Sequence, residues 1–144
     1  MKPTVSTAIG APVLDLLGMK LSLLVSDADS DRALMVGELH VSPGQGIPPH
    51  VHTREDEVFH VLEGRLTFTV GEREVAAGAG TTVFGPRNSP HALRNDSDQP
   101  ARVLLMLAPG HLQSMFAEFD RLPKGAPDPA LVAEITGRYG ISFV

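Results

Sequence analysis

The chain lacks cysteine and tryptophan, and its single tyrosine and six phenylalanines leave it poor in aromatic side chains. Without cysteine it can form neither a disulfide nor a thiolate metal site, so imidazole or carboxylate groups must hold any metal ion. Hydrophobic residues still make up 42% of the sequence, which is enough for one core. That core is expected to be mainly aliphatic.

Two further absences limit the partners. The net charge is −5 at pH 7, whereas nucleic acids and anionic membrane surfaces attract basic proteins. The longest apolar runs, such as residues 103–109, are far shorter than the roughly 20 residues of a membrane-spanning helix. The first residues also lack the charged, apolar and small-residue order of a signal peptide. We therefore expect a cytoplasmic protein with no nucleic-acid or membrane partner.

Short strand-like segments separated by turn-forming residues recur along most of the chain, which is typical of a β-sandwich or barrel. The first two segments indicate a hairpin, and Glu63-Gly64 indicates a second, tight one. Residues 1–12 indicate an irregular arm, and residues 42–49, with three prolines, indicate a loop. The expected strands span residues 20–25, 33–41, 57–62, 65–70, 73–76, 81–84, 91–95 and 101–107.

The spacing of apolar residues becomes helical after Pro109, over residues 112–119. Asp128 followed by Pro129 is a typical helix start, and Gly140 is a typical stop. We predict two short helices packed on the outside of a β core. A length of 144 residues suits one domain. The expected single domain spans residues 1–144, with a core of about 13–108 and a helical tail of about 110–144.

Four residues form a candidate metal site. His50 and His52 point to the same side of a strand, because side chains alternate along it. Glu57 and His91 each begin a strand-like segment, and strand ends converge in a barrel. Three imidazoles and one carboxylate suit Fe(II), Mn(II), Ni(II), Co(II) or Zn(II) better than Mg(II) or Ca(II), and leave coordination positions open for catalysis. We predict one divalent transition-metal ion here.

Residues 44–64 resemble the first motif of the cupin family, in which a glycine precedes His-X-His, a glutamate and a second glycine. Residues 80–95 resemble the second motif, except that Asn88 replaces a glycine. Asparagine tolerates the left-handed conformation that such a glycine often adopts. The matching positions are Gly44, His50, His52, Glu57 and Gly64 in the first motif, and Gly80, Pro86, His91 and Asn95 in the second.

The resemblance implies an all-β fold, a small double-stranded β-helix or jelly-roll barrel of cupin type with a short C-terminal helical tail. It implies that His50, His52, Glu57 and His91 are the metal ligands. A homodimer is also implied, since small cupins often associate through edge strands. The segment around residues 52–64 further resembles quercetin-dioxygenase-like cupins.

Other candidate residues lie near these motifs. Phe59 has the strand parity of Glu57, and Phe68 and Phe84 lie on neighbouring segments. All three are candidates for an apolar substrate pocket, with barrel core as the alternative. Glu57 is also a candidate catalytic base, if it leaves the metal.

The remaining histidines are not assigned to the site. His60 has the opposite strand parity to Glu57, so it should face away from the barrel interior. His40 and His111 have no partner at a ligand-like spacing. The charged residues 54–56 beside the ligands are interpreted as a solvated loop.

Three functions remain open, because one fold hosts several chemistries. We favour a small-molecule dioxygenase of quercetinase-like type, since an open metal site can bind O₂ and an oxygen-bearing substrate together. The first alternative is an isomerase or lyase in which the metal polarises a carbonyl. The second is a module that binds a small molecule without turnover.

Overall fold

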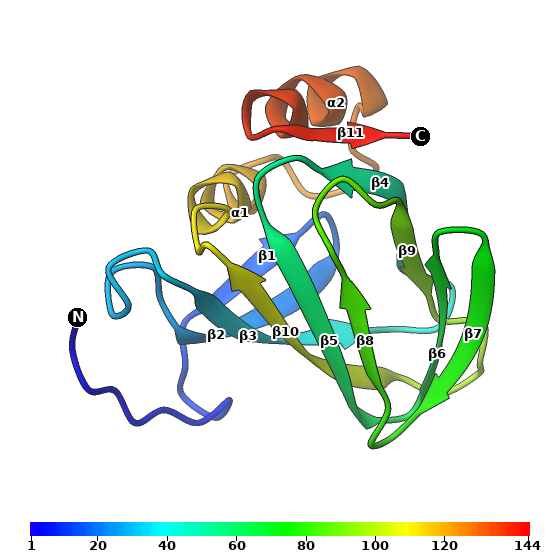
Figure 1. Cartoon of the computed structure of the whole chain (residues 1–144), viewed down its shortest axis with the longest axis horizontal. Helices are drawn as coiled ribbons and strands as arrows, with labels where there is room; N and C mark the ends of the chain where they lie inside the picture. The colour runs from blue at the N-terminus through cyan, green and yellow to red at the C-terminus, as the bar shows by residue number, and fades with distance from the viewer.

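The computed structural model describes residues 1–144 and arranges them mainly in two antiparallel sheets (Figure 1). Neighbouring strands within each sheet are joined by hydrogen bonds. In sheet order, the six-stranded sheet contains β1 (Val13–Leu16), β2 (Met19–Val25), β3 (Met35–Val41), β10 (Ala101–Ala108), β5 (Asp56–Glu63) and β8 (Thr82–Gly85). The five-stranded sheet contains β11 (Ile141–Phe143), β4 (Gly46–His52), β9 (His91–Arg94), β6 (Arg65–Val70) and β7 (Arg73–Gly78).

The core lies between the two sheets. Along β10 alternate residues are buried, among them Val103, Leu105 and Leu107, as expected where one sheet face is covered. Phe59 of β5 and Phe68 of β6 meet across the sheets with ring centroids 5.3 Å apart. They belong to a mostly aliphatic cluster of 23 buried hydrophobic residues. The predicted all-β jelly-roll fold is confirmed.

One predicted hairpin is right and the other is wrong. β2 and β3 pair directly, as expected. The turn at Gly64 does not form a hairpin, because β5 pairs with β10 and β8 whereas β6 pairs with β7 and β9. Gly64, with a φ of 79°, instead passes the chain from one sheet to the other. A turn signal in the sequence does not reveal which sheet the next strand joins.

Three strands depart from the prediction. The short edge strands β1 and β11 were not expected, and β4 begins inside the predicted loop of residues 42–49. Pro48 and Pro49 lack the N–H that a sheet ladder requires. They fit because the register between β4 and β9 is irregular from Ile47 to His50. Proline is tolerated at such an irregularity, so β4 still carries His50 and His52 into the sheet.

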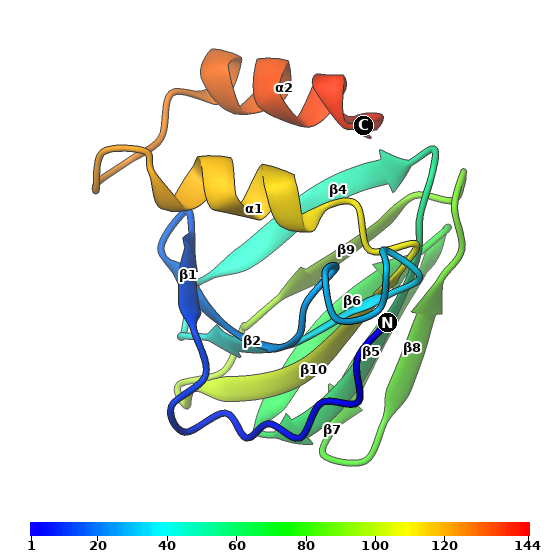
Figure 2. The same ribbon diagram turned by 90° about the vertical axis from the view of Figure 1, so that its left-hand side faces the viewer.

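The helical tail covers one end of the sheets (Figure 2). α1 (Gln113–Asp120) packs against β1, and α2 (Pro129–Arg138) packs against β11. The Asp128 carboxylate accepts a hydrogen bond of 2.9 Å from the Ala130 N–H, which confirms the expected helix start. Neither helix has the length and apolar character needed to cross a bilayer.

Candidate metal centre

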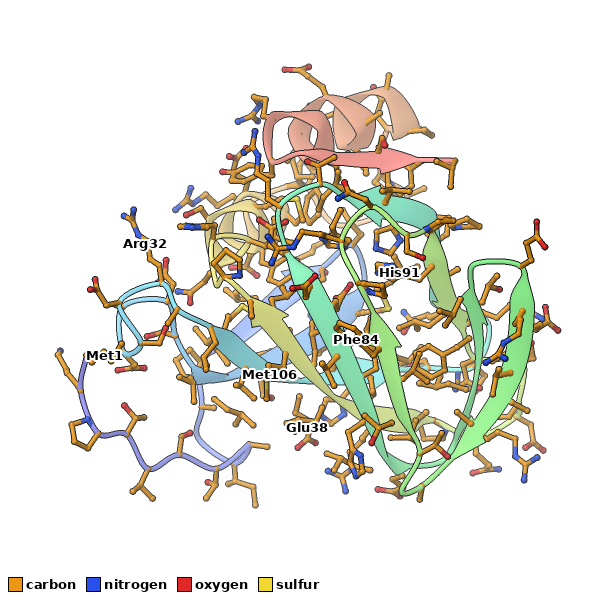
Figure 3. All side chains as sticks on the ribbon, viewed as in Figure 1. Met1, Arg32, Glu38, Phe84, His91 and Met106 are labelled. Atoms are coloured by element: carbon orange, nitrogen blue, oxygen red, sulfur yellow. The ribbon has the colours of Figure 1, made fainter.

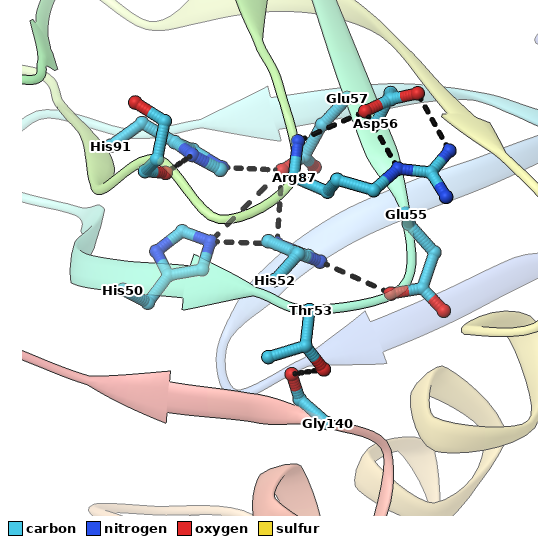
Figure 4. A network of polar contacts seen from close by, with 10 residues as sticks. His50, His52, Thr53, Glu55, Asp56, Glu57, Arg87, His91 and Gly140 are labelled. Carbon is cyan, nitrogen blue, oxygen red and sulfur yellow. Dashed lines mark hydrogen bonds and ion pairs between the residues drawn. The ribbon is translucent and has the colours of Figure 1, made fainter.

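The four predicted ligands come together from both sheets. His50 and His52 lie on β4, His91 begins β9, and Glu57 lies on β5 of the other sheet. Direct pairing of His50 with His91 across β4 and β9 aligns two of the imidazoles. Alternation along β4 brings His52 to the same face. Figure 4 shows the four side chains converging on one point.

The donor atoms have the spacing of a metal shell. One donor atom from each residue lies within 4.8 Å of the other three. Glu57 Oε2 is 2.8 Å from His91 Nε2 and 3.2 Å from His52 Nε2. His50 Nε2 is 3.0 Å from His52 Nε2. With metal–ligand bonds of about 2.1 Å, neighbouring donors of an octahedral ion stand about 3.0 Å apart and opposite donors about 4.2 Å. The four residues therefore fit one transition-metal ion.

Hydrogen bonds from the ring nitrogens orient two of the imidazoles. His50 Nδ1 donates to the Pro48 carbonyl oxygen at 2.8 Å, and His91 Nδ1 donates to the Ser89 carbonyl oxygen at 3.1 Å. A neutral imidazole with its proton on Nδ1 presents a lone pair at Nε2. Lone pairs and a carboxylate oxygen at these separations repel one another unless a proton or a metal cation lies among them. This arrangement suits a cation.

Burial and charge set the protonation states of the centre. All four side chains are buried. Burial lowers the pKa of His50 to about 4. Burial opposes ionisation of Glu57, but its hydrogen bonds with His52 and His91 outweigh burial and lower its pKa to about 2. Burial also favours neutral His52, but the carboxylates of Glu55 and Glu57 prevail and raise its pKa to about 9. A protonated His52 would have to release its Nε2 proton before that nitrogen could bind a metal ion.

The histidines that the sequence set aside lie away from the centre. His60 Nδ1 pairs instead with Thr82 Oγ1 at 2.8 Å, on the outer face of β5. His40 is exposed, with Nε2 3.4 Å from Glu38 Oε1. His111 is exposed at the start of the tail. The parity argument for His60 therefore matches the structure.

An apolar cavity of about 320 Å³ adjoins the centre. His50, His52 and Glu57 form part of its wall, and 12 of its 20 lining residues are hydrophobic. The barrel side of the wall includes Leu16, Leu17, Met19, Leu39, Ile47 and Leu105. The tail contributes Met115, Phe116, Phe119, Val132, Thr136, Ile141 and Phe143. No lysine or arginine lines the cavity.

None of the three predicted pocket phenylalanines lines this cavity. Phe59 and Phe68 are 2% and 1% exposed and belong to the core, which was the stated alternative. Phe84, labelled on β8 in Figure 3, is 54% exposed, so its assignment to a pocket was wrong. The reason is strand parity: Phe84 lies opposite Val58, a residue of the outer face of β5.

The actual pocket wall was not predicted. The sequence predicts apolar faces on the two tail helices, packed on the outside of the barrel. In the structure these helix faces form part of the wall of the cavity beside the candidate metal ligands. The burial of Met115, Phe116 and Phe119 shows that this face of α1 is covered. An apolar helix face is a signal of burial, but not of the surface that buries it.

The charged run beside the ligands was also misjudged. Asp56 and Arg87 do form a partly exposed ion pair of 2.7 Å. Glu55, however, is only 1% exposed, so it does not belong to a solvated loop. Its Oε2 lies 3.6 Å from His52 Nδ1. The glutamate three residues after His52 is the one signal in the sequence that could have indicated this contact.

Gly85 leaves room for a ligand ring. It lies opposite Glu57, and a Cβ at this position would stand 3.0 Å from His91 Nδ1 and 3.1 Å from His91 Cγ. We expect Gly85→Ala to displace this buried ring and weaken Zn(II) binding by roughly tenfold, a cost typical of disturbed ligand orientation. Competition with a chelator measures the change.

Gly78→Ala is the matched control for this substitution. Gly78 is also a strand glycine, and a Cβ there would meet no atom within 4 Å. Equal zinc affinities of the two variants would show that the space beside His91 is unimportant.

Sequence and structure comparisons identify the family and the fold. The cupin domain family model matches residues 37–107, and many solved structures share the fold. The chain belongs to the cupin superfamily.

The similar proteins carry names that refer to different functions. The chain is 29% identical to the polyketide synthase CurC of Streptomyces cyaneus over 103 residues, covering 67% of this chain and 65% of that protein. It is 24% identical to the oxalate-binding protein of Thermotoga maritima over 85 residues, covering 59% and 70%. The structure of the polyketide cyclase RemF from Streptomyces resistomycificus has a TM-score of 0.65 at 24% identity, covering 74% and 79%. The chain spans only 44% of a further relative, the uncharacterized protein MJ1618 of Methanocaldococcus jannaschii.

Proposed function

We propose that this chain is a metal-dependent enzyme that promotes the reaction of an uncharged, ring-containing small molecule with O₂. His50, His52, Glu57 and His91 hold one divalent transition-metal ion in the proposal. The observation that carries it is the apolar cavity of about 320 Å³ whose wall includes three of these four residues. A molecule held in that cavity has its reacting end at the metal ligands.

The cavity wall favours an apolar substrate over a small dianion. Its lining contains no lysine or arginine, and its one carboxylate is Glu57. Apart from the metal ion itself, an oxalate-like dianion would gain no lysine or arginine partner from the wall to offset its lost hydration. A flat aromatic molecule instead buries its rings against the side chains of α1, α2 and β11. One carbonyl or enol oxygen then suffices to direct it to the centre.

The chain's own residues have distinct roles in this proposal. When bound, the metal supplies a Lewis acid and open coordination positions for oxygen ligands. The tail side chains, such as Phe116 and Val132, exclude water from the cavity. Glu57 is the only carboxylate in the wall, so it is the side chain that accepts the proton of an enolic hydroxyl if it leaves the metal as the substrate binds.

A second function is favoured by the likeness to CurC. The name of that relative assigns it to polyketide synthesis, and ring closure or isomerisation of a polyketide-like molecule also begins at a polarised carbonyl. The same cavity and the same four ligands serve such a Lewis-acid reaction. It consumes no O₂, which separates it from the first function.

The test uses the protein loaded separately with Fe(II), Mn(II), Ni(II), Co(II) or Zn(II). Flavonols and linear or cyclic 1,3-diketones are supplied in air and under nitrogen, with oxygen uptake and product masses recorded. Oxygen uptake coupled to substrate loss, and absent under nitrogen, is the expected result. Turnover that persists under nitrogen would establish the second function. Tight binding without turnover in either atmosphere would leave the binding-module alternative and refute both enzymes.

A further inference from the structure

Glu55 is a buried carboxylate without a hydrogen-bond donor. It is 1% exposed, and neither of its side-chain oxygens has a hydrogen-bond partner. Its neighbour Asp56 behaves differently, because Arg87 pairs with that carboxylate at the surface. A buried carboxylate without a hydrogen-bond donor is costly in free energy. Such a group requires an explanation in terms of what it faces.

The nearest cationic or donor group that Glu55 faces is the ring of His52. Glu55 Oε2 lies 3.6 Å from His52 Nδ1, and Figure 4 shows the carboxylate directed at that nitrogen. His52 Nδ1 is also a buried atom without a hydrogen-bond partner. This separation is slightly longer than a hydrogen bond, so a small movement of either side chain would satisfy both groups together.

His52 is the exception among the three ligand histidines. His50 and His91 each donate their Nδ1 proton to a backbone carbonyl. No carbonyl serves His52 in this way. A histidine that binds a metal through Nε2 needs an acceptor at Nδ1, which keeps the proton there and holds the ring plane. Glu55 Oε2, 3.6 Å from His52 Nδ1, is placed to be that acceptor.

We propose that Glu55 is a positioning residue for the metal centre, whose carboxylate accepts the Nδ1 proton of His52 and thereby directs Nε2 at the ion. The inference rests on the metal site of the proposed function, but not on the reaction proposed for it. Glu55 does not touch the ion or the cavity, and it acts only through His52.

The test compares two substitutions of nearly equal side-chain length. Glu55→Gln keeps an oxygen that can accept from His52, whereas Glu55→Met removes every strong acceptor and leaves an apolar group that suits the buried position. Zinc affinity is measured by chelator competition. We expect Glu55→Met to lower it by about 10–100-fold, as loss of an outer acceptor does, and Glu55→Gln to recover at least threefold of that loss.

Two further readouts separate positioning from a structural role. The Co(II) absorption spectrum reports ligand geometry, and we expect it to change in Glu55→Met more than in Glu55→Gln. In the zinc form, the His52 Nδ1 proton should give an NMR signal that is lost from Glu55→Met. Asp56→Asn, one residue along, is the control and should retain wild-type zinc affinity.

The outcomes distinguish this inference from the proposed function. Equal zinc affinity of Glu55→Met and Glu55→Gln, or wild-type affinity in Glu55→Met, would overturn the positioning role while the metal site stands. Failure of the wild-type protein to bind zinc would refute the metal site itself. Thermal unfolding of each metal-free variant shows that a change in affinity is not a change in folding.

Discussion

The His50→Ala variant is expected to bind no stoichiometric metal and to lose all metal-dependent turnover. His50 supplies one of three imidazole donors, and its Nε2 lies 3.0 Å from that of His52. Loss of an outer partner alone costs about 10–100-fold in metal affinity, so removal of a ligand should cost more. Metal analysis after exhaustive dialysis measures the content directly. The protein should carry no histidine tag, because a tag binds the same ions.

His60→Ala is the control for this experiment. It removes an imidazole only ten positions further along the sequence, but His60 lies on the outer face of β5 and pairs with Thr82. Its metal content should equal that of the wild type. Retained metal in His50→Ala would refute the ligand assignment, whereas lost metal in His60→Ala would show that the site extends beyond the four ligands.

The second large effect is expected at Gly64, where the chain passes from one sheet to the other. Its φ of 79° is strained for a residue with a side chain. A Cβ would also stand 2.7 Å from the Pro100 carbonyl oxygen and 2.9 Å from Ala101 Cα. Both neighbours are backbone atoms. We expect Gly64→Ala to lower the free energy of unfolding by about 3 kcal/mol, about half of it from strain and half from the close contact.

Gly80→Ala separates the two contributions. Gly80 also has a positive φ, 89°, but a Cβ there would meet no atom within 4 Å. Its substitution should cost only the backbone strain, about 1.5 kcal/mol. Urea unfolding is measured on metal-free protein, because a bound ion would add its own stabilisation. Equal losses in the two variants would show that the contact with the 100–101 backbone is unimportant.

The cluster of candidate metal ligands was predictable because most of the information that defines it is local. His50, His52 and Glu57 lie within eight positions of one another, and strand alternation alone puts the two histidines on one face. His91 is distant in sequence, and the second cupin motif was needed to connect it with the others. The structure brings all four together.

The pocket and Glu55 depend instead on tertiary packing. An apolar face on α1 predicts burial, but not that β1 and the metal ligands lie beneath it. A glutamate between two charged residues has the pattern of a surface loop, and only the folded chain reveals that Glu55 is enclosed. The prediction for Phe84 was wrong for a simpler reason, because its strand parity places it on the outer face of the sheet. The homodimer, the single-domain organisation and the cytoplasmic location remain predictions.

The pairing of β11 with β4 has a practical consequence for any study of this protein. Phe143 lies opposite His50 and Ile141 opposite His52, and the Val144 N–H donates to the Pro49 carbonyl oxygen at 3.0 Å. A purification tag or fluorescent fusion joined after Val144 would therefore disturb the pairing of β11 with β4, the strand that carries His50 and His52. Met1 lies on the opposite side of the molecule from this end of the chain (Figure 1), so fusions and surface immobilisation belong there.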